Sequence, residues 1–136
     1  MAERSTARDV ALRALVACER QGAWSDGFLK KEIGGAGLDG RDAALATRLC
    51  FGVQQNRMLL DFWLGNLSKI PLDKMEPAVR SILRLGAYQI LFLDRVPDHA
   101  AVNQAVEQGR KSSRNPRSAG LVNGILRSLI RQKSEL

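Results

Sequence analysis

Basic side chains without acidic neighbours are the feature of this sequence that could do chemistry. From Gln108 to Ser134 the chain contains seven Lys and Arg residues and no Asp or Glu. They are Arg110, Lys111, Arg114, Arg117, Arg127, Arg131 and Lys133. The whole chain has 21 basic and 14 acidic residues, a net charge of +7, so the excess positive charge lies in this one segment. Cations concentrated in this way favour an anionic partner, above all the phosphates of a nucleic acid.

Three of these arginines are expected on one face of the last helix. If that helix runs from about Pro116 to Gln132, Arg117, Arg127 and Arg131 fall within an arc of roughly 80°, opposite its apolar positions. A solvated face is the ordinary explanation for such a charge run and stays open as an alternative. The absence of acidic residues, in an otherwise neutral chain, favours phosphate binding.

No constellation for catalysis or metal binding is visible in the sequence. His99 is the only histidine, and its place after a Pro-Asp pair is typical of a helix start. Cys18 and Cys50 lack CxxC spacing, so we interpret both as reduced core residues. The glycine-rich run at 34–37 lacks the Lys-Ser/Thr signature of a phosphate loop and is predicted to be a flexible loop. We therefore expect this chain to be no enzyme and to hold no metal or cofactor.

Length and composition predict one domain over residues 1–136. A chain of 136 residues with 45% hydrophobic content can bury a core of its own. Its apolar runs are far shorter than the roughly 20 residues that span a bilayer, and the N-terminus has no apolar signal core. We expect no membrane association and a cytoplasmic location.

Apolar residues follow a helical period along the chain, and no alternating run of useful length predicts a strand. The sequence therefore predicts an all-α fold of about seven helices. A capping box of Thr6 and Asp9 begins the first helix, and Gly22 stops it. The second helix follows Ser25 and is ended by Gly34-Gly35, after which a loop runs to Gly40 with Asp39 as the next N-cap. Later signals are a junction or bend near 54–57, a helix end at Pro71, a helix start at Pro77 and a turn at 94–97.

The fifth predicted helix is apolar over nearly its whole circumference. From Val79 to Leu93 most residues are hydrophobic, and such a helix belongs in the centre of a domain. Tyr88 is then a core residue with a satisfied hydroxyl. We also expect Trp63 in the core, whereas Trp24 has no clear assignment.

Several separated segments carry a family resemblance. They are Leu49-Cys50-Phe51-Gly52-Val53, Leu60-Asp61-Phe62-Trp63-Leu64, and the runs at 83–97, 100–107 and 120–127. In this order they resemble the NusB/RsmB family of helical RNA-binding domains. The stretch at 91–103 has the form of the RsmB-type N-terminal domain. Departures at Gln104 and at Gln108-Gly109 affect only the details of the sixth helix.

The resemblance implies a NusB-like helical bundle that binds RNA. RsmB proteins are 16S ribosomal RNA cytosine-5 methyltransferases, in which a NusB-like domain precedes a larger catalytic portion that uses S-adenosylmethionine. We expect this chain to be such an accessory domain, detached from that portion, which alone would need S-adenosylmethionine. Its expected partners are RNA, in particular ribosomal RNA, together with the catalytic portion of its own enzyme or a ribosomal protein.

The resemblance also directs attention to the N-terminal arginines. In NusB proteins an arginine-rich N-terminal region takes part in RNA binding, and this chain offers Arg4, Arg8, Arg13 and Arg20 there. Nearby acidic residues nearly cancel them, and Arg8 is expected to pack its stem and pair with an acid. Only Arg13 and Arg20 share a clearly wet face. The predicted RNA-binding residues are thus a main set, Arg110, Lys111, Arg114, Arg117, Arg127 and Arg131, and a secondary pair, Arg13 and Arg20.

Alternatives to the methyltransferase accessory domain stay open at this point. The chain could be a free-standing NusB-like antitermination factor that binds RNA with a ribosomal protein, or a protein-interaction module that binds no RNA. Fold alone does not decide between them. Asn103 and Asn123 match family positions, where RNA contact would be one explanation; we favour a structural role in which each ties a turn to a helix.

Overall fold

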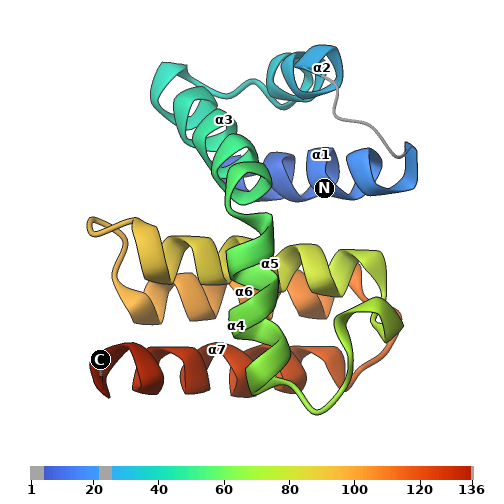
Figure 1. Ribbon diagram of the computed structural model, residues 1–136. Coiled ribbons are helices and arrows are strands. Elements are labelled where there is room, and N and C mark those ends of the chain that lie inside the picture. Colours follow the sequence, from blue (N-terminus) through green and yellow to red (C-terminus); the bar gives the residue numbers. More distant parts are fainter. Residues whose placement is uncertain (1–4, 22–25, 136) are drawn as a thin grey trace.

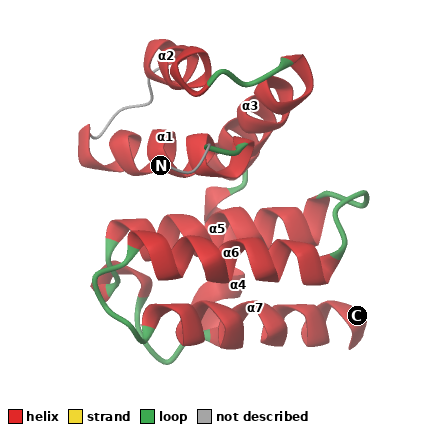
Figure 2. Ribbon diagram, turned by 180° about the vertical axis from the view of Figure 1, so that it is seen from behind, coloured by secondary structure: helices red, strands yellow, loops and turns green. Residues whose placement is uncertain are grey.

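The described part of the chain is entirely helical apart from its turns. The computed structural model describes residues 5–21 and 26–135, and in these ranges it contains seven α-helices, one short 3-10 helix and no strand (Figure 2). The helices are α1 (Ala7–Gln21), α2 (Asp26–Ala36), α3 (Gly40–Gln55), α4 (Arg57–Leu67), the 3-10 helix η1 (Leu72–Lys74), α5 (Pro77–Phe92), α6 (Asp98–Ser112) and α7 (Ser118–Glu135). The predicted all-α fold of seven helices is confirmed.

Two groups of helices build the molecule. Figure 1 shows α1, α2 and α3 in an upper group, and below them α5, α6 and α7 side by side with α4 crossing them. Helix α5 packs against α1, α3, α4, α6 and α7, so it joins the two groups. The central position predicted for this helix is confirmed.

Local signals fix several helix ends where they were predicted. The Thr6 and Asp9 capping box forms, with each side chain accepting a hydrogen bond from the other residue's backbone N–H at 3.1 and 3.2 Å. Asp39 caps α3, since its Oδ1 accepts from the Asp42 N–H at 2.8 Å. Pro77 is the first residue of α5, where no hydrogen bond from its nitrogen is needed.

The predicted end of the second helix is wrong. Helix α2 continues through Gly34 and Gly35 to Ala36, so these glycines neither stop it nor form a loop. The chain turns at Gly37, whose φ of 65° lies in the left-handed region that glycine adopts without strain. At the other end of the chain, α7 begins at Ser118 and reaches Glu135. Gly22, Trp24 and Arg4 lie outside the described residues.

The core is built around α5. All ten residues from 81 to 90 are buried, and Tyr88 is 6% exposed with its ring stacked on Phe92. The ring of Tyr88 occupies the space beside Gly52, where a Cβ atom would lie 2.1 Å from it. Trp63 is half-buried and packs against the core. The α3–α5 contact therefore depends on a glycine opposite an aromatic ring.

The two cysteines occupy the interface between α1 and α3. Cys50 is fully buried, and burial raises the pKa of its thiol to about 12. Cys18 is half-buried, and its Sγ accepts a hydrogen bond from Gln54 Nε2 at 3.4 Å. Both are free thiols; the predicted core position is confirmed for Cys50, whereas Cys18 is only half-buried.

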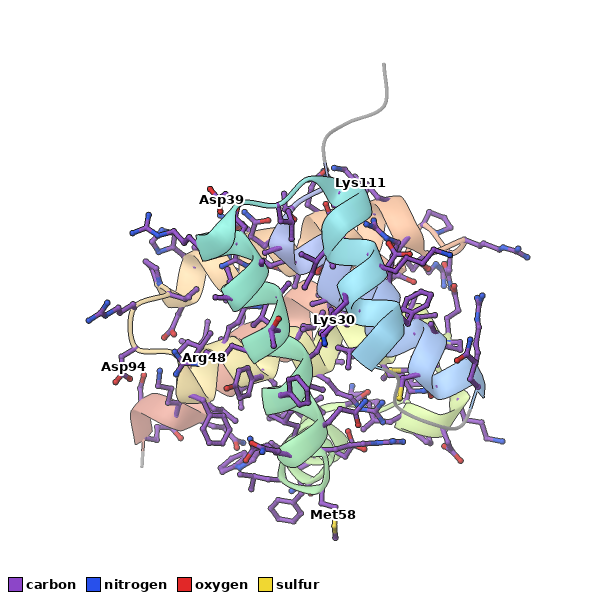
Figure 3. The ribbon with its side chains drawn as sticks, turned by 90° about the horizontal axis from the view of Figure 1, so that it is seen from above. Lys30, Asp39, Arg48, Met58, Asp94 and Lys111 are labelled. Carbon is purple, nitrogen blue, oxygen red and sulfur yellow. The ribbon has the colours of Figure 1, made fainter. Side chains whose placement is uncertain are left out.

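Helix α4 carries the most exposed apolar side chains of the described residues. Met58 is 89% and Phe62 is 63% exposed. Figure 3 places Met58 and Lys111 at opposite edges of the molecule, so this apolar surface is separate from the end of α6. Within the described ranges, no helix is long and apolar enough to cross a membrane.

Candidate nucleic-acid interface

The basic residues of the main predicted set begin where α6 ends. Arg110 and Lys111 are in the last turn of α6, and Arg114 and Arg117 are in the connection that leads to α7. All four are exposed to solvent. A helix C-terminus attracts cations through its unpaired carbonyl groups, so the two residues in α6 also stabilise that helix.

The connection between α6 and α7 is held by its own polar side chains. Ser113 Oγ donates to Glu76 Oε1 at 2.7 Å and lies 2.6 Å from Ser118 Oγ. It also accepts from the Asn115 N–H at 3.1 Å, while Asn115 Oδ1 accepts from the Arg117 N–H at 2.9 Å. Arg117 then opens α7, because its carbonyl accepts from the Leu121 N–H. The bonds of Ser113 and Asn115 fix the backbone that carries Arg114 and Arg117. The sequence alone does not predict this role for the two residues.

The remaining arginines of the main set lie on the outer face of α7. Arg127 and Arg131 are exposed. Gly120 and Gly124, which precede them in α7, are exposed as well. At 1.5 Å per residue, Arg117 and Arg131 are separated by about 20 Å along the helix. Arg114, Arg117, Arg127 and Arg131 thus form a strip from the α6–α7 connection along α7, which we call the arginine strip.

The strip arginines differ from the acid-paired arginines of the molecule in what their side chains contact. Several arginines elsewhere pair with carboxylates: Arg13 with Glu32 at 2.9 Å, Arg84 with Asp61 at 2.7 Å, Arg110 with Glu107 at 3.2 Å, and Arg80 with Glu19. In the strip, Arg127 Nε donates to Asn123 Oδ1 at 2.9 Å and an Arg131 terminal nitrogen donates to Ser128 Oγ at 3.0 Å. No described carboxylate forms an ion pair with the four strip arginines, so their charges remain available to an anion.

Lys133 belongs to the acid-free segment but has a structural role. Its Nζ donates to the Ile90 carbonyl at 2.7 Å and lies 3.5 Å from Asp98 Oδ1. These contacts tie the last turn of α7 to the end of α5 and the start of α6. The positive charge of this residue is therefore partly compensated.

The secondary pair on α1 lies beside the end of α6. Arg13 and Arg20 are exposed and line a cavity of about 450 Å³ together with Phe28 of α2 and Ser112 of α6. Arg13 is already engaged, since Glu32 accepts from its Nε and Ser5 Oγ accepts from a terminal nitrogen at 3.1 Å. The fold thus brings this pair beside Ser112, the last residue of α6, whereas Arg127 and Arg131 lie on α7.

Arg8 is directed into the protein. Its Nε donates to Oε1 of the buried Gln89 at 2.7 Å, so its direct partner is an amide and not the expected acid. Desolvation lowers the pKa of its guanidinium, and the nearby charge of Asp42 opposes that shift. Arg8 is therefore a structural residue that joins α1 to α5.

Neither asparagine at a family position ties a turn to a helix, so that interpretation is wrong. Asn103 is exposed within α6, and Asn123 is half-buried within α7 and bonds to Arg127. The residue that organises a turn is Asn115. An Asn-Pro pair is a known turn signal and could have marked it.

Metal-ligating side chains are not clustered in the described part of the chain. No cluster of three or more His, Cys, Asp or Glu side chains there could hold a metal ion. His99 is exposed in the first turn of α6, as its sequence position predicted.

Fold and surface together define an all-α domain with an exposed cationic strip whose charges no acid among residues 5–21 and 26–135 compensates. A comparison with protein families identifies the family of this domain: the NusB family model matches residues 5–131. The chain belongs to the NusB family.

Relatives with curated descriptions are much longer than this chain. A probable ribosomal RNA small subunit methyltransferase B of Bacillus subtilis (strain 168) is 37% identical over 134 residues, which cover 96% of this chain and 29% of the relative. A putative methyltransferase of Mycobacterium tuberculosis (strain H37Rv) is 38% identical over 90% of this chain and 26% of its own length. The chain thus spans between a quarter and a third of these two proteins.

Solved structures support the fold. NusB of T. maritima superposes with a TM-score of 0.84 and 25% sequence identity, covering 96% of this chain and 95% of that one. NusB and NusE, antitermination factors crystallised with double-stranded RNA, give a TM-score of 0.83 at 19% identity, covering 93% of this chain and 94% of the matched chain. The NusB-like bundle expected from the sequence is confirmed.

Proposed function

We propose that this chain is an RNA-binding accessory domain of a small-subunit ribosomal RNA methyltransferase. The observation that carries the proposal is the arginine strip, whose four charges have no carboxylate partner among the described residues. Two relatives whose descriptions are methyltransferases, each matching most of this chain, supply the enzyme class. The substrate RNA would be ribosomal.

In this proposal the domain contributes affinity and orientation. The four guanidinium groups bind phosphates along an RNA strand, which releases counterions and holds the RNA against α7. The domain itself does no chemistry and binds no cofactor. Transfer of the methyl group, and binding of S-adenosylmethionine, would belong to a catalytic portion outside this chain. A cytoplasmic location remains a prediction of the same proposal.

A binding experiment with charge reversal tests the RNA-binding role. The 136-residue chain is titrated against 16S ribosomal RNA at low salt, and the four-residue variant Arg114→Glu/Arg117→Glu/Arg127→Glu/Arg131→Glu is compared with it. The variant should lose binding, because repulsion replaces four phosphate contacts. The matched control reverses Lys30, Lys31, Arg41 and Arg48, which are exposed on α2 and α3 and make the same change in net charge.

The control separates a specific surface from general charge. It should bind RNA with at most a few-fold loss, since α2 and α3 do not pack against α7. Absence of binding by the wild-type chain, or equal loss in both variants, would contradict the assignment of RNA binding to the arginine strip.

A further inference from the structure

We infer that Asn123 is a positioning residue for RNA binding: its uncharged carboxamide holds the Arg127 guanidinium in place without neutralising it. The inference rests on the proposed function. It adds a residue that carries no charge and that the basic set does not include.

The geometry is that of two side chains one turn apart on α7. Arg127 Nε donates to Asn123 Oδ1 at 2.9 Å, with the asparagine half-buried and the arginine exposed. An exposed arginine has many rotamers, and a bond to a partly buried neighbour reduces their number before RNA arrives. Less conformational entropy is then lost when the arginine binds a phosphate.

The bond also leaves the phosphate-binding side of the guanidinium open. It uses the Nε–H, so the two terminal nitrogens keep their N–H groups for a phosphate. Arg131 also bonds to a neutral acceptor, the Ser128 hydroxyl at 3.0 Å, although it does so through a terminal nitrogen. Two neighbouring strip arginines are thus oriented by neutral acceptors.

Other exposed arginines bond to carboxylates, whereas Arg127 bonds to a neutral amide. Arg13 and Arg110 are also exposed, yet each bonds to a glutamate, at 2.9 and 3.2 Å. A carboxylate orients a guanidinium as well as an amide does, but it cancels the charge and competes with a phosphate. Asn123 supplies the orientation alone.

A double-mutant cycle tests whether Asn123 acts through Arg127. RNA affinity is measured for the wild-type chain, Asn123→Ala, Arg127→Ala and the double variant, with 16S ribosomal RNA as the probe. Asn123→Ala should weaken binding about three- to tenfold in the wild type, the effect of one lost side-chain hydrogen bond at an exposed position. It should have no further effect once Arg127 is replaced, because the residue it positions is gone.

A second variant keeps the bond and removes the charge. In Asn123→Asp the new carboxylate still accepts from Arg127 but neutralises it, so the slope of log affinity against log salt should fall by about 0.7 to 0.9. Asn123→Ala should leave that slope unchanged. The matched control is Asn103→Asp, which adds the same charge at an exposed position of α6. Its slope should equal that of the wild type.

The outcomes are distinct from those of the proposed function. If the wild-type chain binds RNA but Asn123→Ala binds equally well, or weakens binding equally with and without Arg127, the positioning role is wrong while the proposed function stands. If the wild-type chain binds no RNA, the proposed function fails and the positioning role fails with it. Thermal melting of each variant verifies that it folds, and alanine, a strong helix former, suits the middle of α7.

Discussion

The partner of each arginine decides what that arginine can bind. Arg84 is buried and gives both Nε and a terminal nitrogen to Asp61, at 2.7 and 3.0 Å, so it serves the fold. Arg127 bonds to an amide on the surface and keeps its full charge. Counting arginines in a sequence treats the two alike, whereas their partners separate a structural residue from a candidate phosphate ligand.

A single glycine fixes the contact between α3 and α5. Gly52→Ala would put a Cβ atom 2.1 to 2.5 Å from three atoms of the Tyr88 side chain, which is 6% exposed and cannot easily move. We expect a loss of about 1 to 3 kcal/mol in the free energy of unfolding, measured by thermal or urea denaturation. Gly65→Ala on α4 is the control, because its Cβ meets nothing within 4 Å and should stabilise by about 0.5 to 1 kcal/mol. Equal stabilities of the two variants would contradict the packing described for Tyr88.

At the scale of elements, α5 holds the two helix groups together. Leu83 is fully buried and Ile90 is 2% exposed, so replacing either by alanine leaves a cavity at the centre of the fold. Each variant should lose about 2 to 5 kcal/mol of stability in the same denaturation assay, a large share of a typical total. Leu59→Ala, at a position that is 45% exposed on α4, should change it far less. Unaltered melting of both core variants would show that α5 is peripheral.

Helices α1 and α7 are expected to contribute unequally to RNA binding. The pair Arg117→Glu/Arg127→Glu should weaken binding more than Arg13→Glu/Arg20→Glu, although both make the same change in charge. The reason is that Glu32 already compensates Arg13, at 2.9 Å. Affinities of the two double variants for the same RNA are the measurement. The reverse order would place the main surface on the N-terminal half.

Across the whole molecule, the sequence predicts those helix ends that depend on residues within one turn. Asp39 and Pro77 mark helix starts correctly, because capping and the missing N–H act within one turn. The sequence does not predict the end of α2 correctly, because Gly34, Gly35 and Gly37 could each end a helix and only the φ of Gly37 selects one.

Long-range and side-chain relations are the part that the sequence does not predict. The approach of α1 to the end of α6 joins residues about 100 positions apart, as in the contact of Gln108 with Asp9 at 3.5 Å. The role of Asn123 depends on a rotamer of Arg127 that no periodicity reveals. The sequence shows that basic residues are concentrated in one segment without acidic residues. It does not show that the side chains of Arg127 and Arg131 bond to neutral partners.

The salt dependence of RNA affinity tests the central claim most directly. Arg114, Arg117, Arg127 and Arg131 are changed together to glutamine, which removes their charge and adds none. If all four bind phosphates, the slope of log affinity against log salt should become shallower by about 3, at about 0.7 per phosphate for a single strand. An unchanged slope, with affinity retained, would contradict the account, because the arginine strip would then be a solvated face and no RNA surface.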